Sequence, residues 1–244
     1  MNAAVTGTKP PGAEDEEQAA RWVREMFGRV AHCYDRANHM LSLNLDRGWR
    51  RKTVERVRDV MAVPGASVLD LCCGTGDLTL ALSRERGGAV MGSDYSRPML
   101  DGAAKKDAGL LFEADALSLP LPDESVDLVT CAFGFRNLVD YDAGLRELRR
   151  VIRPRGMAAI LEFSHPPGRI FGALYEFYSL RVLPKVGGMI SGDAAAYSYL
   201  QTSVKKFPGA EELARRMEEA GFEQVGFERM TGGIVALHTG RVAD

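Results

Sequence analysis

The chain has 244 residues, of which 45% are hydrophobic and 26% charged, and its formal net charge is −2. This composition is that of an ordinary globular protein, and it excludes a disordered, collagen-like or coiled-coil chain. The near balance of acidic and basic residues also gives no sign of a nucleic-acid partner, which would need a basic surface.

The first 18 residues are polar and include glycine and proline, so we expect a flexible tail before one domain that covers residues 19–244. The tail lacks the apolar segment of a secretory signal, and no apolar run in the chain reaches the length of a membrane span. The four cysteines lack CxxC spacing and the four histidines lack ligand spacing. We therefore expect reduced thiols, no metal site and a cytoplasmic location.

Two amphipathic helices are expected over residues 19–30 and 46–61, and together they make up the N-terminal helices of residues 19–62. The second helix should stop before Pro64. The apolar face of the first helix carries Trp22, Met26 and Phe27. That face either packs on the core or touches the inner face of a membrane. The polar face is not strongly basic, which disfavours the membrane.

Short apolar runs alternate with helical patterns between residues 67 and 163. The expected strands cover residues 67–72, 89–93, 110–113, 126–132 and 157–163. The expected helices between them cover residues 77–86, 98–106 and 141–152. This alternation is typical of right-handed βαβ units in an open, doubly wound parallel sheet.

The C-terminal part breaks this alternation. Residues 210–220 form a helical pattern, and two strands follow over residues 222–230 and 234–240. Only three residues separate the strands, so they form a hairpin and the last strand runs antiparallel to its neighbour. Before the hairpin, residues 164–207 form an apolar insertion, which either covers a ligand site as a lid or packs on the core. Its large apolar side chains are Phe171, Leu174, Tyr175, Phe177, Tyr178, Leu180, Val182 and Leu183.

The strongest motif is the sequence DLCCGTGD, which begins at Asp70 where the first strand meets its helix. Gly74 and Gly76 allow the backbone to turn tightly and approach a ligand, and the helix after them points free N–H groups at it. Asp94 lies at the end of the next strand, 20 residues after Gly74, where a carboxylate accepts hydrogen bonds from ribose hydroxyls. Together they predict an adenosine-containing ligand. The alternative is a plain turn with an exposed acid.

The predicted ligand has no phosphate. A dinucleotide-binding turn would need a third glycine at the position of Thr79, and the turn offers neither a basic residue for a phosphate nor a Walker lysine. S-adenosylmethionine (SAM), an adenosine with an amino-acid tail and a sulfonium, fits these features. In these residues the chain resembles the class I SAM-dependent methyltransferases.

That resemblance implies an α/β fold with a doubly wound, seven-stranded, mostly parallel sheet of strand order 3-2-1-4-5-7-6, whose last strand is antiparallel. In the family, the glycine loop lies under the ligand, the acid after strand two holds the ribose, and an acid after strand three meets the adenine amino group. Asp115 matches this last position, although it could instead only cap a turn before Leu117. The implied cofactor-binding residues are Asp70, Gly74, Thr75, Gly76, Asp94, Asp115, Ala116 and Ala132.

Two further stretches carry a more specific resemblance. The first contains Tyr34-Asp35, Asn38, Ser42 and Trp49, and the second contains Arg150-Val-Ile-Arg-Pro154, Gly156 and Leu161-Glu162-Phe-Ser164. They resemble the two signatures of the ubiquinone/menaquinone biosynthesis C-methyltransferases, and the resemblance covers residues 27–242. Four positions depart from the signatures: Ala37 replaces Met, Asp46 replaces His, Arg153 replaces Lys and Arg155 replaces Gly. Asp46 matters most, because the usual histidine is a candidate for binding or deprotonating the quinol.

This resemblance implies that the chain uses SAM to methylate a carbon of a polyprenyl hydroquinol. The favoured acceptor is demethylmenaquinol, in the last step of menaquinone biosynthesis. The alternatives are 2-methoxy-6-polyprenyl-benzoquinol in ubiquinone biosynthesis and a non-catalytic SAM-binding module. A lipid-soluble quinol is thus the expected partner. Peripheral membrane contact remains open, and the sequence predicts no oligomeric state.

The segment from Phe133 to Asn137 follows the fourth strand, which neighbours the first strand at the switch point of such a sheet. We expect this segment to face the sulfonium, and the resemblance places Arg136 and Asn137 around the acceptor ring as catalytic residues. Alternatively, Arg136 pairs with a surface carboxylate and Asn137 caps the next helix. Glu162, at the tip of the fifth strand, either faces the same crevice or pairs with an arginine. His165 is expected to be structural rather than catalytic.

Overall fold

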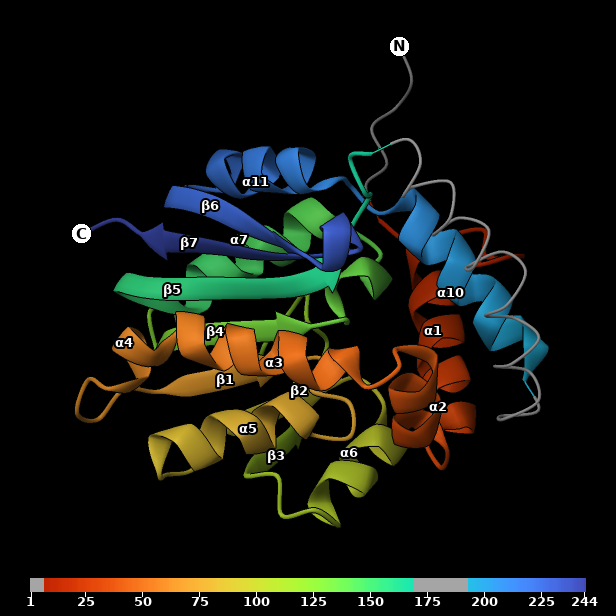
Figure 1. Cartoon of the computed structure of the whole chain (residues 1–244), viewed down its shortest axis with the longest axis horizontal. Helices are drawn as coiled ribbons and strands as arrows, with labels where there is room; N and C mark the ends of the chain where they lie inside the picture. The colour runs from red at the N-terminus through yellow and green to blue at the C-terminus, as the bar shows by residue number, and fades with distance from the viewer. Residues whose placement is uncertain (1–6, 169–192) are drawn as a thin grey trace.

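The computed structural model describes residues 7–168 and 193–244 (Figure 1). At its centre is a seven-stranded sheet of strand order β3-β2-β1-β4-β5-β7-β6. The strands are β1 (Val68–Leu71), β2 (Met91–Asp94), β3 (Leu110–Glu113), β4 (Val126–Ala132), β5 (Ile152–Phe163), β6 (Phe222–Met230) and β7 (Val235–Val242). The first five strands pair in parallel, whereas β7 is antiparallel to β5 and β6. The predicted fold class and strand order are confirmed.

Helices cover both faces of the sheet. One face carries α3 (Leu45–Arg56), α4 (Arg58–Met61) and α5 (Asp77–Arg86), and the other carries α7 (Tyr141–Val151) and α11 (Ala210–Glu219). Side chains alternate along β4, so Leu128 packs in the first layer and Val129 in the second. Both residues are fully buried. The sheet is therefore apolar on both faces, as the continuous apolar runs of its strands predict.

A third group of helices stands at one end of the sheet. It consists of α1 (Glu16–Val30), α2 (Tyr34–Leu41), α6 (Arg97–Ala104) and α10 (Ala194–Lys206). Figure 1 shows α1 and α10 side by side at the end toward which β4 and β5 point. Met26 and Val23 of α1 are buried among these helices, and the ring centroid of Trp22 lies 5.0 Å from that of Tyr199. The apolar face of α1 thus packs inside the protein.

The N-terminal region differs from the expected pattern in four ways. α1 begins at Glu16, because the side chain of Asp15 caps it by accepting from the N–H of Gln18. Thr8, in the segment expected to be a flexible tail, is buried because its hydroxyl and N–H both find partners in the core. The helix expected over residues 46–61 is divided into α3 and α4 at Val57, where the backbone leaves helical geometry. α2 lies between the two expected helices and was not predicted.

β5 begins earlier than expected. It starts at Ile152, directly after α7, and runs through Pro154. The pairing with β4 shifts register in this part of the strand, between the partners of Ile152 and Met157. A proline lacks the N–H that a regular ladder needs, but such an irregular stretch tolerates it. The other strands and helices that were predicted agree with the structure to within two residues.

The expected lid is only partly described. Residues 169–192, which carry the large apolar side chains of the insertion, lie outside the described residues. The described helix of the insertion, α10, packs against α1. Among residues 7–168 and 193–244, no helix is both long and apolar enough to cross a bilayer.

Candidate functional site

A cavity of about 760 Å³, its open mouth included, lies at the carboxyl ends of β1, β2 and β4. Ligands of open α/β sheets bind at this position, because the strand order reverses between β1 and β4. Its described lining includes Ala20, Val23, Arg24, Phe27, Tyr34, Phe133, Gly134 and Leu138. Five of the predicted site residues also line it: Gly74, Asp94, Asp115, Ala116 and Asn137.

The glycine turn between β1 and α5 shapes one wall of this cavity. Gly76 has a φ of +83°, and a Cβ atom there would lie 2.4 Å from the Cβ of Ala108, so only glycine fits. Gly74 also has a positive φ, +56°, and its N–H donates to Asp94 Oδ2 at 2.8 Å. Gly74 lies on the cavity wall, whereas Gly76 lies behind it and begins α5.

Asp94 ends β2 with its carboxylate held by two backbone N–H groups. Oδ2 accepts from Gly74 and Oδ1 accepts from Ser96, both at 2.8 Å. Burial raises the pKa of Asp94 to about 6, although these hydrogen bonds oppose the shift. A carboxylate oxygen has two lone pairs, so each oxygen is able to accept one further hydrogen bond. This geometry suits the two hydroxyls of a ribose.

Asp115 follows β3 and lines the same cavity, next to Ala116. Its Oδ1 accepts from the N–H of Leu117 at 2.9 Å, which closes a tight turn. The expected turn cap is therefore present, together with the predicted place on the cavity wall. The other oxygen of Asp115 accepts no hydrogen bond from the described residues. That oxygen is free to meet an amino group in the cavity.

Asp70 does not line the cavity, contrary to the expected cofactor contact. It is 1% exposed and accepts hydrogen bonds from the hydroxyls of Thr79 at 2.6 Å and Thr130 at 2.8 Å. These bonds join β1 to α5 and to β4. Thr79 occupies the position of the third glycine of a dinucleotide turn, and its hydroxyl is engaged by Asp70. Asp70 therefore stabilises the frame around the cavity.

Three more expected cofactor residues, Thr75, Gly76 and Ala132, also lie outside the lining. Thr75 is buried and donates its hydroxyl hydrogen to the carboxylate of Asp35 on α2. Ala132 ends β4 beside Leu161 and packs against the core. These residues support the turn and the sheet edge from behind.

The charges around the first cavity suit a cationic ligand without phosphates. Two carboxylates, those of Asp94 and Asp115, line it. The one arginine among its described lining residues, Arg24, forms an ion pair with Glu113, and its guanidinium lies 5.0 Å from the centroid of the Tyr95 ring. Because Arg24 is already neutralised, a positively charged sulfonium meets little repulsion. The residues present therefore fit SAM.

A second cavity, of about 490 Å³, adjoins the first and is mainly apolar. It lies between α1, α2 and α10, and Phe27 and Tyr34 line both cavities. The rings of these two residues meet edge to face, with centroids 6.0 Å apart. The other described lining residues are Met26, Val30, Cys33, Ala37, Asn38, Arg136, Ala196, Tyr199 and Leu200. An apolar cavity with a few polar groups is suited to an aromatic ring.

Arg136 lines the second cavity and not the first. It is 5% exposed, and its Nη1 lies 3.1 Å from Oε1 of Glu162, which is 1% exposed. Burial disfavours its charge, but Glu162 raises the pKa of Arg136 above its ordinary value, so the guanidinium stays charged. Its Nε is buried without a hydrogen-bond partner among the described residues. Such a donor points to an acceptor atom that a ligand supplies.

This ion pair decides between the alternatives that the sequence left open for Glu162 and for Arg136. Glu162 pairs with an arginine, and Arg136 pairs with a buried carboxylate instead of a surface one. The expectation that Arg136 faces the same space as the sulfonium needs a correction. The short helical turn η1 (Phe135–Asn137) directs Arg136 toward α2 and α10, which form the second cavity.

Asn137 lies at the boundary between the two cavities. It lines the first cavity, and its Oδ1 accepts from the hydroxyl of Tyr199, which lines the second, at 3.2 Å. The Tyr199 hydroxyl also lies 2.9 Å from Oγ1 of Thr8. Burial raises the pKa of Tyr199 to about 12, so its hydroxyl stays protonated. Asp140 caps α7, so the alternative that Asn137 caps this helix is wrong.

Tyr34 and Tyr199 are cavity residues to which the sequence analysis gave no chemical role. Burial raises the pKa of Tyr34, although Arg136 opposes the shift, so its hydroxyl also stays protonated. The signal that could have found Tyr34 was its position in the first signature. Tyr199 lies in the insertion, where no pattern distinguishes it from other aromatic residues.

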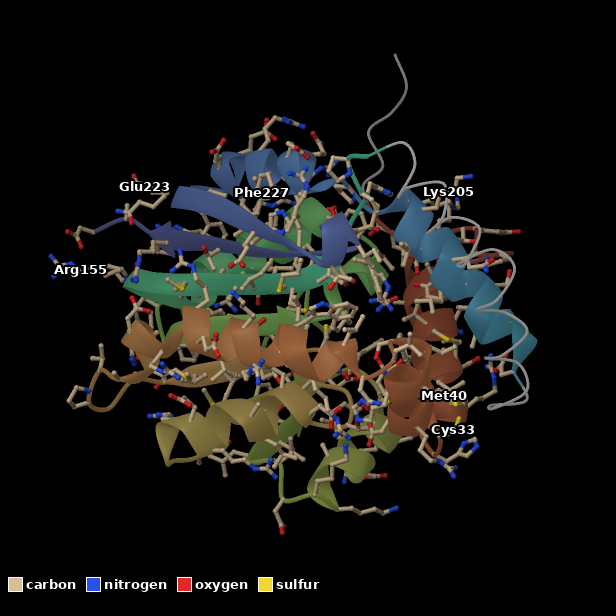
Figure 2. All side chains as sticks on the ribbon, viewed as in Figure 1. Cys33, Met40, Arg155, Lys205, Glu223 and Phe227 are labelled. Atoms are coloured by element: carbon tan, nitrogen blue, oxygen red, sulfur yellow. The ribbon has the colours of Figure 1, made fainter. Side chains whose placement is uncertain are left out.

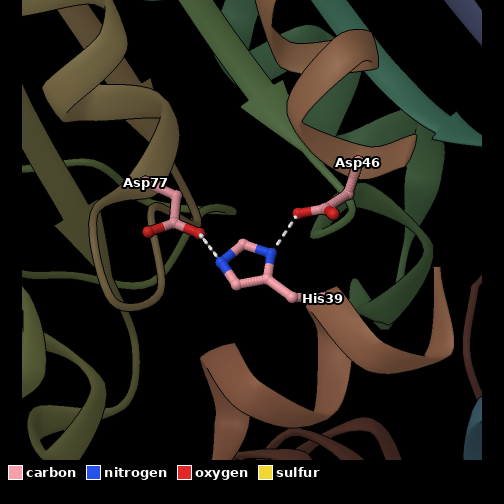
Figure 3. Close-up of side chains that lie close together, drawn as sticks. All are labelled: His39, Asp46 and Asp77. Atoms are coloured by element: carbon pink, nitrogen blue, oxygen red, sulfur yellow. Dashed lines mark hydrogen bonds and ion pairs between the residues drawn. The ribbon is translucent and has the colours of Figure 1, made fainter. Parts of the chain in front are cut away.

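A cluster of charged side chains joins α2, α3 and the start of α5 (Figure 3). His39 Nδ1 lies 2.9 Å from Asp46 Oδ2, and His39 Nε2 lies 3.8 Å from Asp77 Oδ2. Their ligand atoms are close enough for a metal ion. However, Arg50 pairs with Asp46 and Asp77, and Lys106 Nζ lies 2.9 Å from Asp77 Oδ1. Because these cations neutralise both carboxylates, we interpret the cluster as an ion-pair network.

Asp46, which replaces the histidine of the first signature, belongs to this network and lines neither cavity. It is 3% exposed, and Ser42 donates to its Oδ1 at 2.7 Å. Burial opposes its charge, but the bonds from Ser42 and Arg50 lower the pKa of Asp46 below its ordinary value. Asp46 thus holds α3 against α2, at a distance from any acceptor in the second cavity.

The sequence matches the model of the ubiE/COQ5 methyltransferase family over residues 13–242. The chain belongs to this family. It is 46% identical to a demethylmenaquinone methyltransferase of Thermus thermophilus, over 88% of this chain and 99% of that protein. It is also 42% identical to a ubiquinone/menaquinone biosynthesis C-methyltransferase, UbiE, of Shewanella frigidimarina, over 93% of this chain and 92% of that protein.

The fold of this ubiE/COQ5 family member is also found in a solved SAM-dependent methyltransferase from Thermotoga maritima, described as a possible histamine N-methyltransferase. The two align with a TM-score of 0.63 over 90% of this chain and 99% of that chain, at 19% identity. At this identity the likeness shows the fold alone. The chain is a SAM-dependent methyltransferase, so the predicted family, enzyme class and cofactor are confirmed.

Proposed function

We propose that this ubiE/COQ5 methyltransferase transfers a methyl group from SAM to a ring carbon of a polyprenyl hydroquinol, and that its acceptor is demethylmenaquinol. The observation that carries this proposal is the pair of adjoining cavities that share Phe27 and Tyr34. The first cavity offers carboxylates for a nucleoside. The second is apolar and has a charged arginine in its wall. Such a pair suits a cationic donor beside an apolar aromatic acceptor.

The residues of the first cavity have separate roles in this proposal. Asp94 accepts hydrogen bonds from the ribose hydroxyls, and the free oxygen of Asp115 accepts from the adenine amino group. The backbone of Gly74 leaves room for the ligand because it carries no side chain. Asn137, fixed by Tyr199, closes the wall toward the acceptor.

The residues of the second cavity make the acceptor carbon reactive. SAM supplies a methyl group on a positively charged sulfur. A ring carbon can attack that methyl group when the neighbouring phenol has lost its proton, and an ordinary phenol loses it only near pH 10. As the new carbon–carbon bond forms, the methyl–sulfur bond breaks, its electron pair stays on the sulfur, and S-adenosylhomocysteine is the leaving group. The guanidinium of Arg136 stays protonated and is no base, and Glu162 already balances its charge. Its unpartnered Nε–H is the group that donates a hydrogen bond to a phenolate in an apolar cavity. The protonated hydroxyl of Tyr34 is a second donor. After attack, the ring carbon loses its own proton and the ring becomes aromatic again.

The role of Arg136 is tested by Arg136→Lys, which keeps a positive charge beside Glu162 but removes the Nε donor. We expect kcat to fall by roughly 100-fold, as for the loss of one donor to a developing oxyanion. SAM affinity, measured by calorimetry, should change less than about threefold, because Arg136 does not line the first cavity.

The matched control for this variant is Arg229→Lys on β6. Arg229 also has a buried Nε without a partner among the described residues, and it pairs with Glu211, outside the lining of both cavities. Its kcat should stay at the wild-type value. An unchanged kcat in Arg136→Lys would remove Arg136 from the mechanism.

The acceptor itself is tested with the purified chain, SAM carrying an isotopically labelled methyl group, and two quinols in detergent. The name of the Thermus relative favours demethylmenaquinol, and that of the Shewanella relative supports 2-methoxy-6-polyprenyl-benzoquinol as a second candidate. We expect mass spectrometry to find the label in menaquinol. Label only in the benzoquinol product would replace the proposed acceptor, and label in neither would mean that the acceptor is a different molecule.

We also propose that the enzyme works in the cytoplasm, in peripheral contact with the inner face of the membrane. A polyprenyl quinol is a lipid, so the enzyme must meet its acceptor at or near a bilayer. The four cysteines are free thiols, as expected in a reducing compartment. Accumulation of demethylmenaquinone in cells that lack this chain would support the reaction.

A further inference from the structure

Three of the six large hydrophobic side chains that are exposed in the described residues lie within six positions, where α2 turns into α3. Leu43 is 75% exposed, Met40 50% and Leu45 46%. We refer to these three side chains as the α2–α3 tip. Figure 2 labels Met40 beside α2, at the end of the molecule where α1 and α10 stand. Large apolar side chains gathered on one exposed turn indicate a contact outside the chain.

The backbone of the α2–α3 tip adopts a conformation that leucine rarely takes. Leu43 has a φ of +53° and Asn44 a φ of +60°. Asparagine tolerates this left-handed region, whereas the Cβ atom of leucine makes it unfavourable. The turn thus holds Leu43 away from the protein at a conformational cost. Backbone hydrogen bonds within the turn hold this conformation, from Asn44 N–H to His39 O at 2.7 Å and from Leu45 N–H to Ser42 O at 3.0 Å, and they leave the Leu43 side chain exposed for a partner to cover.

The α2–α3 tip lies in a basic part of an acidic chain. Residues 32–52 contain five Arg or Lys residues and two Asp residues, while the whole chain has a net charge of −2. The two Asp residues are already paired, Asp35 with Lys106 and Asp46 with Arg50. Arg36 and Arg47 are exposed and form no ion pair with the described residues. Their charges are available to an anionic partner.

We propose that the α2–α3 tip docks on an anionic lipid bilayer. Leu43, Met40 and Leu45 enter the region between headgroups and acyl chains, and Arg36 and Arg47 pair with lipid phosphates. Apolar side chains flanked by cations are what binding to an anionic membrane surface requires. A purely apolar protein partner would leave the two arginines unpaired, so the charges favour the lipid.

The position of α2 connects this surface to the proposed acceptor. Tyr34, Ala37 and Asn38 of α2 line the second cavity, and Met40 at the end of the same helix belongs to the α2–α3 tip. A bilayer bound there lies next to the helix that forms one wall of the acceptor cavity. The choice of a bilayer rests in part on the proposed function, because the acceptor is a lipid. The docking itself needs neither SAM nor quinol.

The test uses the full-length chain and sedimentation with lipid vesicles. One set of vesicles contains only phosphatidylcholine, and the other has part of it replaced by phosphatidylglycerol. We expect partition into the anionic vesicles to exceed partition into the neutral ones and to weaken as salt is added. Leu43→Ser should lower this partition about tenfold, from the lost burial of one leucine. Arg36→Gln and Arg47→Gln should each lower it roughly fivefold.

Two matched variants control for general effects of these substitutions. Leu110→Ser changes a leucine that is 64% exposed at the start of β3, and Arg215→Gln changes an exposed arginine on α11. Both should bind vesicles like the wild type. Leu43 has little contact to lose, so thermal unfolding and methyl transfer to a detergent-solubilised quinol should be unchanged in Leu43→Ser. This separates a failure of docking from a failure of the proposed reaction.

Two results would overturn the proposal. One is that Leu43→Ser loses no more binding to anionic vesicles than Leu110→Ser does. The other is a dimer in analytical ultracentrifugation that Leu43→Ser dissociates, because the α2–α3 tip would then be covered by a second copy of the chain.

Discussion

Asp94 is a carboxyl whose ionisation should be visible in ligand binding. Burial raises its pKa from 3.8 to about 6. In the proposed role its ionised form accepts hydrogen bonds from both ribose hydroxyls, whereas protonation turns one of its oxygens into a donor. We expect SAM affinity to be constant above pH 7 and to fall by about tenfold for each pH unit below about 6. Calorimetric titrations between pH 5 and pH 8 measure this change.

Two further observations check that Asp94 causes the pH dependence. Asp94→Asn should bind SAM at least about 100-fold more weakly and without this dependence, because an amide does not ionise. The contribution of Asp94 to the free energy of unfolding should change with pH in the opposite sense to SAM affinity. A raised pKa means that the folded chain binds more protons than the unfolded chain between about pH 4 and pH 6, so this group contributes less stability as pH rises through that range. If the SAM affinity of Asp94→Asn fell with decreasing pH as steeply as that of the wild type, Asp94 would not be the group that causes the pH dependence.

Asp94 and Asp70 show how far the role of a single residue could be predicted from the sequence. Both belong to the first two strands, and burial raises both pKa values to about 6. Sequence spacing placed both near the ligand. Only the structure shows that Asp70 is engaged by Thr79 and Thr130, the second of which lies 60 positions away. Spacing along the chain does not report such long-range contacts.

Among the elements, α2 is attached by ion pairs to the start of α5, which follows the glycine turn. Lys106 bonds to Asp35 of α2 at 2.5 Å and to Asp77 of α5 at 2.9 Å. Burial disfavours its charge, but the two carboxylates raise the pKa of Lys106 above its ordinary value. The stabilisation is therefore complete at neutral pH and is lost only as pH rises through this raised pKa. Asp35 follows Tyr34 directly, so the same bonds hold Tyr34 against the cavities.

Removing this contact should loosen α2 and weaken cofactor binding. We expect Lys106→Met to lower the free energy of unfolding by about 1 kcal/mol, which is the upper range for a partly exposed pair. The SAM dissociation constant should rise severalfold, because Tyr34 lines the first cavity, in which we propose that SAM binds. The control is Lys52→Met, whose amino group makes one exposed pair with Glu228 at 3.3 Å. Equal effects of the two variants on SAM binding would show that α2 does not depend on Lys106.

The elements themselves were predictable to different degrees. The strands of the sheet are buried on both faces and are therefore continuous apolar runs, which the sequence displays directly. α2 has eight residues and buries only Ala37, so it has no such pattern and depends on its contacts with other elements. The second cavity was not predicted either. It is formed by α1, α2 and α10, whose contacts join residues far apart in the chain.

At the scale of the whole molecule, the two cavities are not independent. Phe27 of α1 and Tyr34 of α2 form walls of both, and both helices belong to the group that stands at one end of the sheet. A ligand in the first cavity restricts these two side chains. The second ligand then meets a wall that is already ordered and loses less conformational entropy on binding.

Cofactor and acceptor should therefore bind cooperatively. We expect S-adenosylhomocysteine, the demethylated product of SAM, to tighten the binding of a short-chain quinol about fivefold, which corresponds to a coupling free energy of about 1 kcal/mol. The quinol must tighten the binding of S-adenosylhomocysteine by the same factor, because coupling between binding sites is reciprocal. Calorimetric titrations of each ligand with and without the other measure both factors.

Tyr34→Ala should remove the coupling, whereas Tyr95→Ala, which changes a residue of the first cavity alone, should retain it. Equal coupling in the two variants would mean that the shared wall does not connect the cavities.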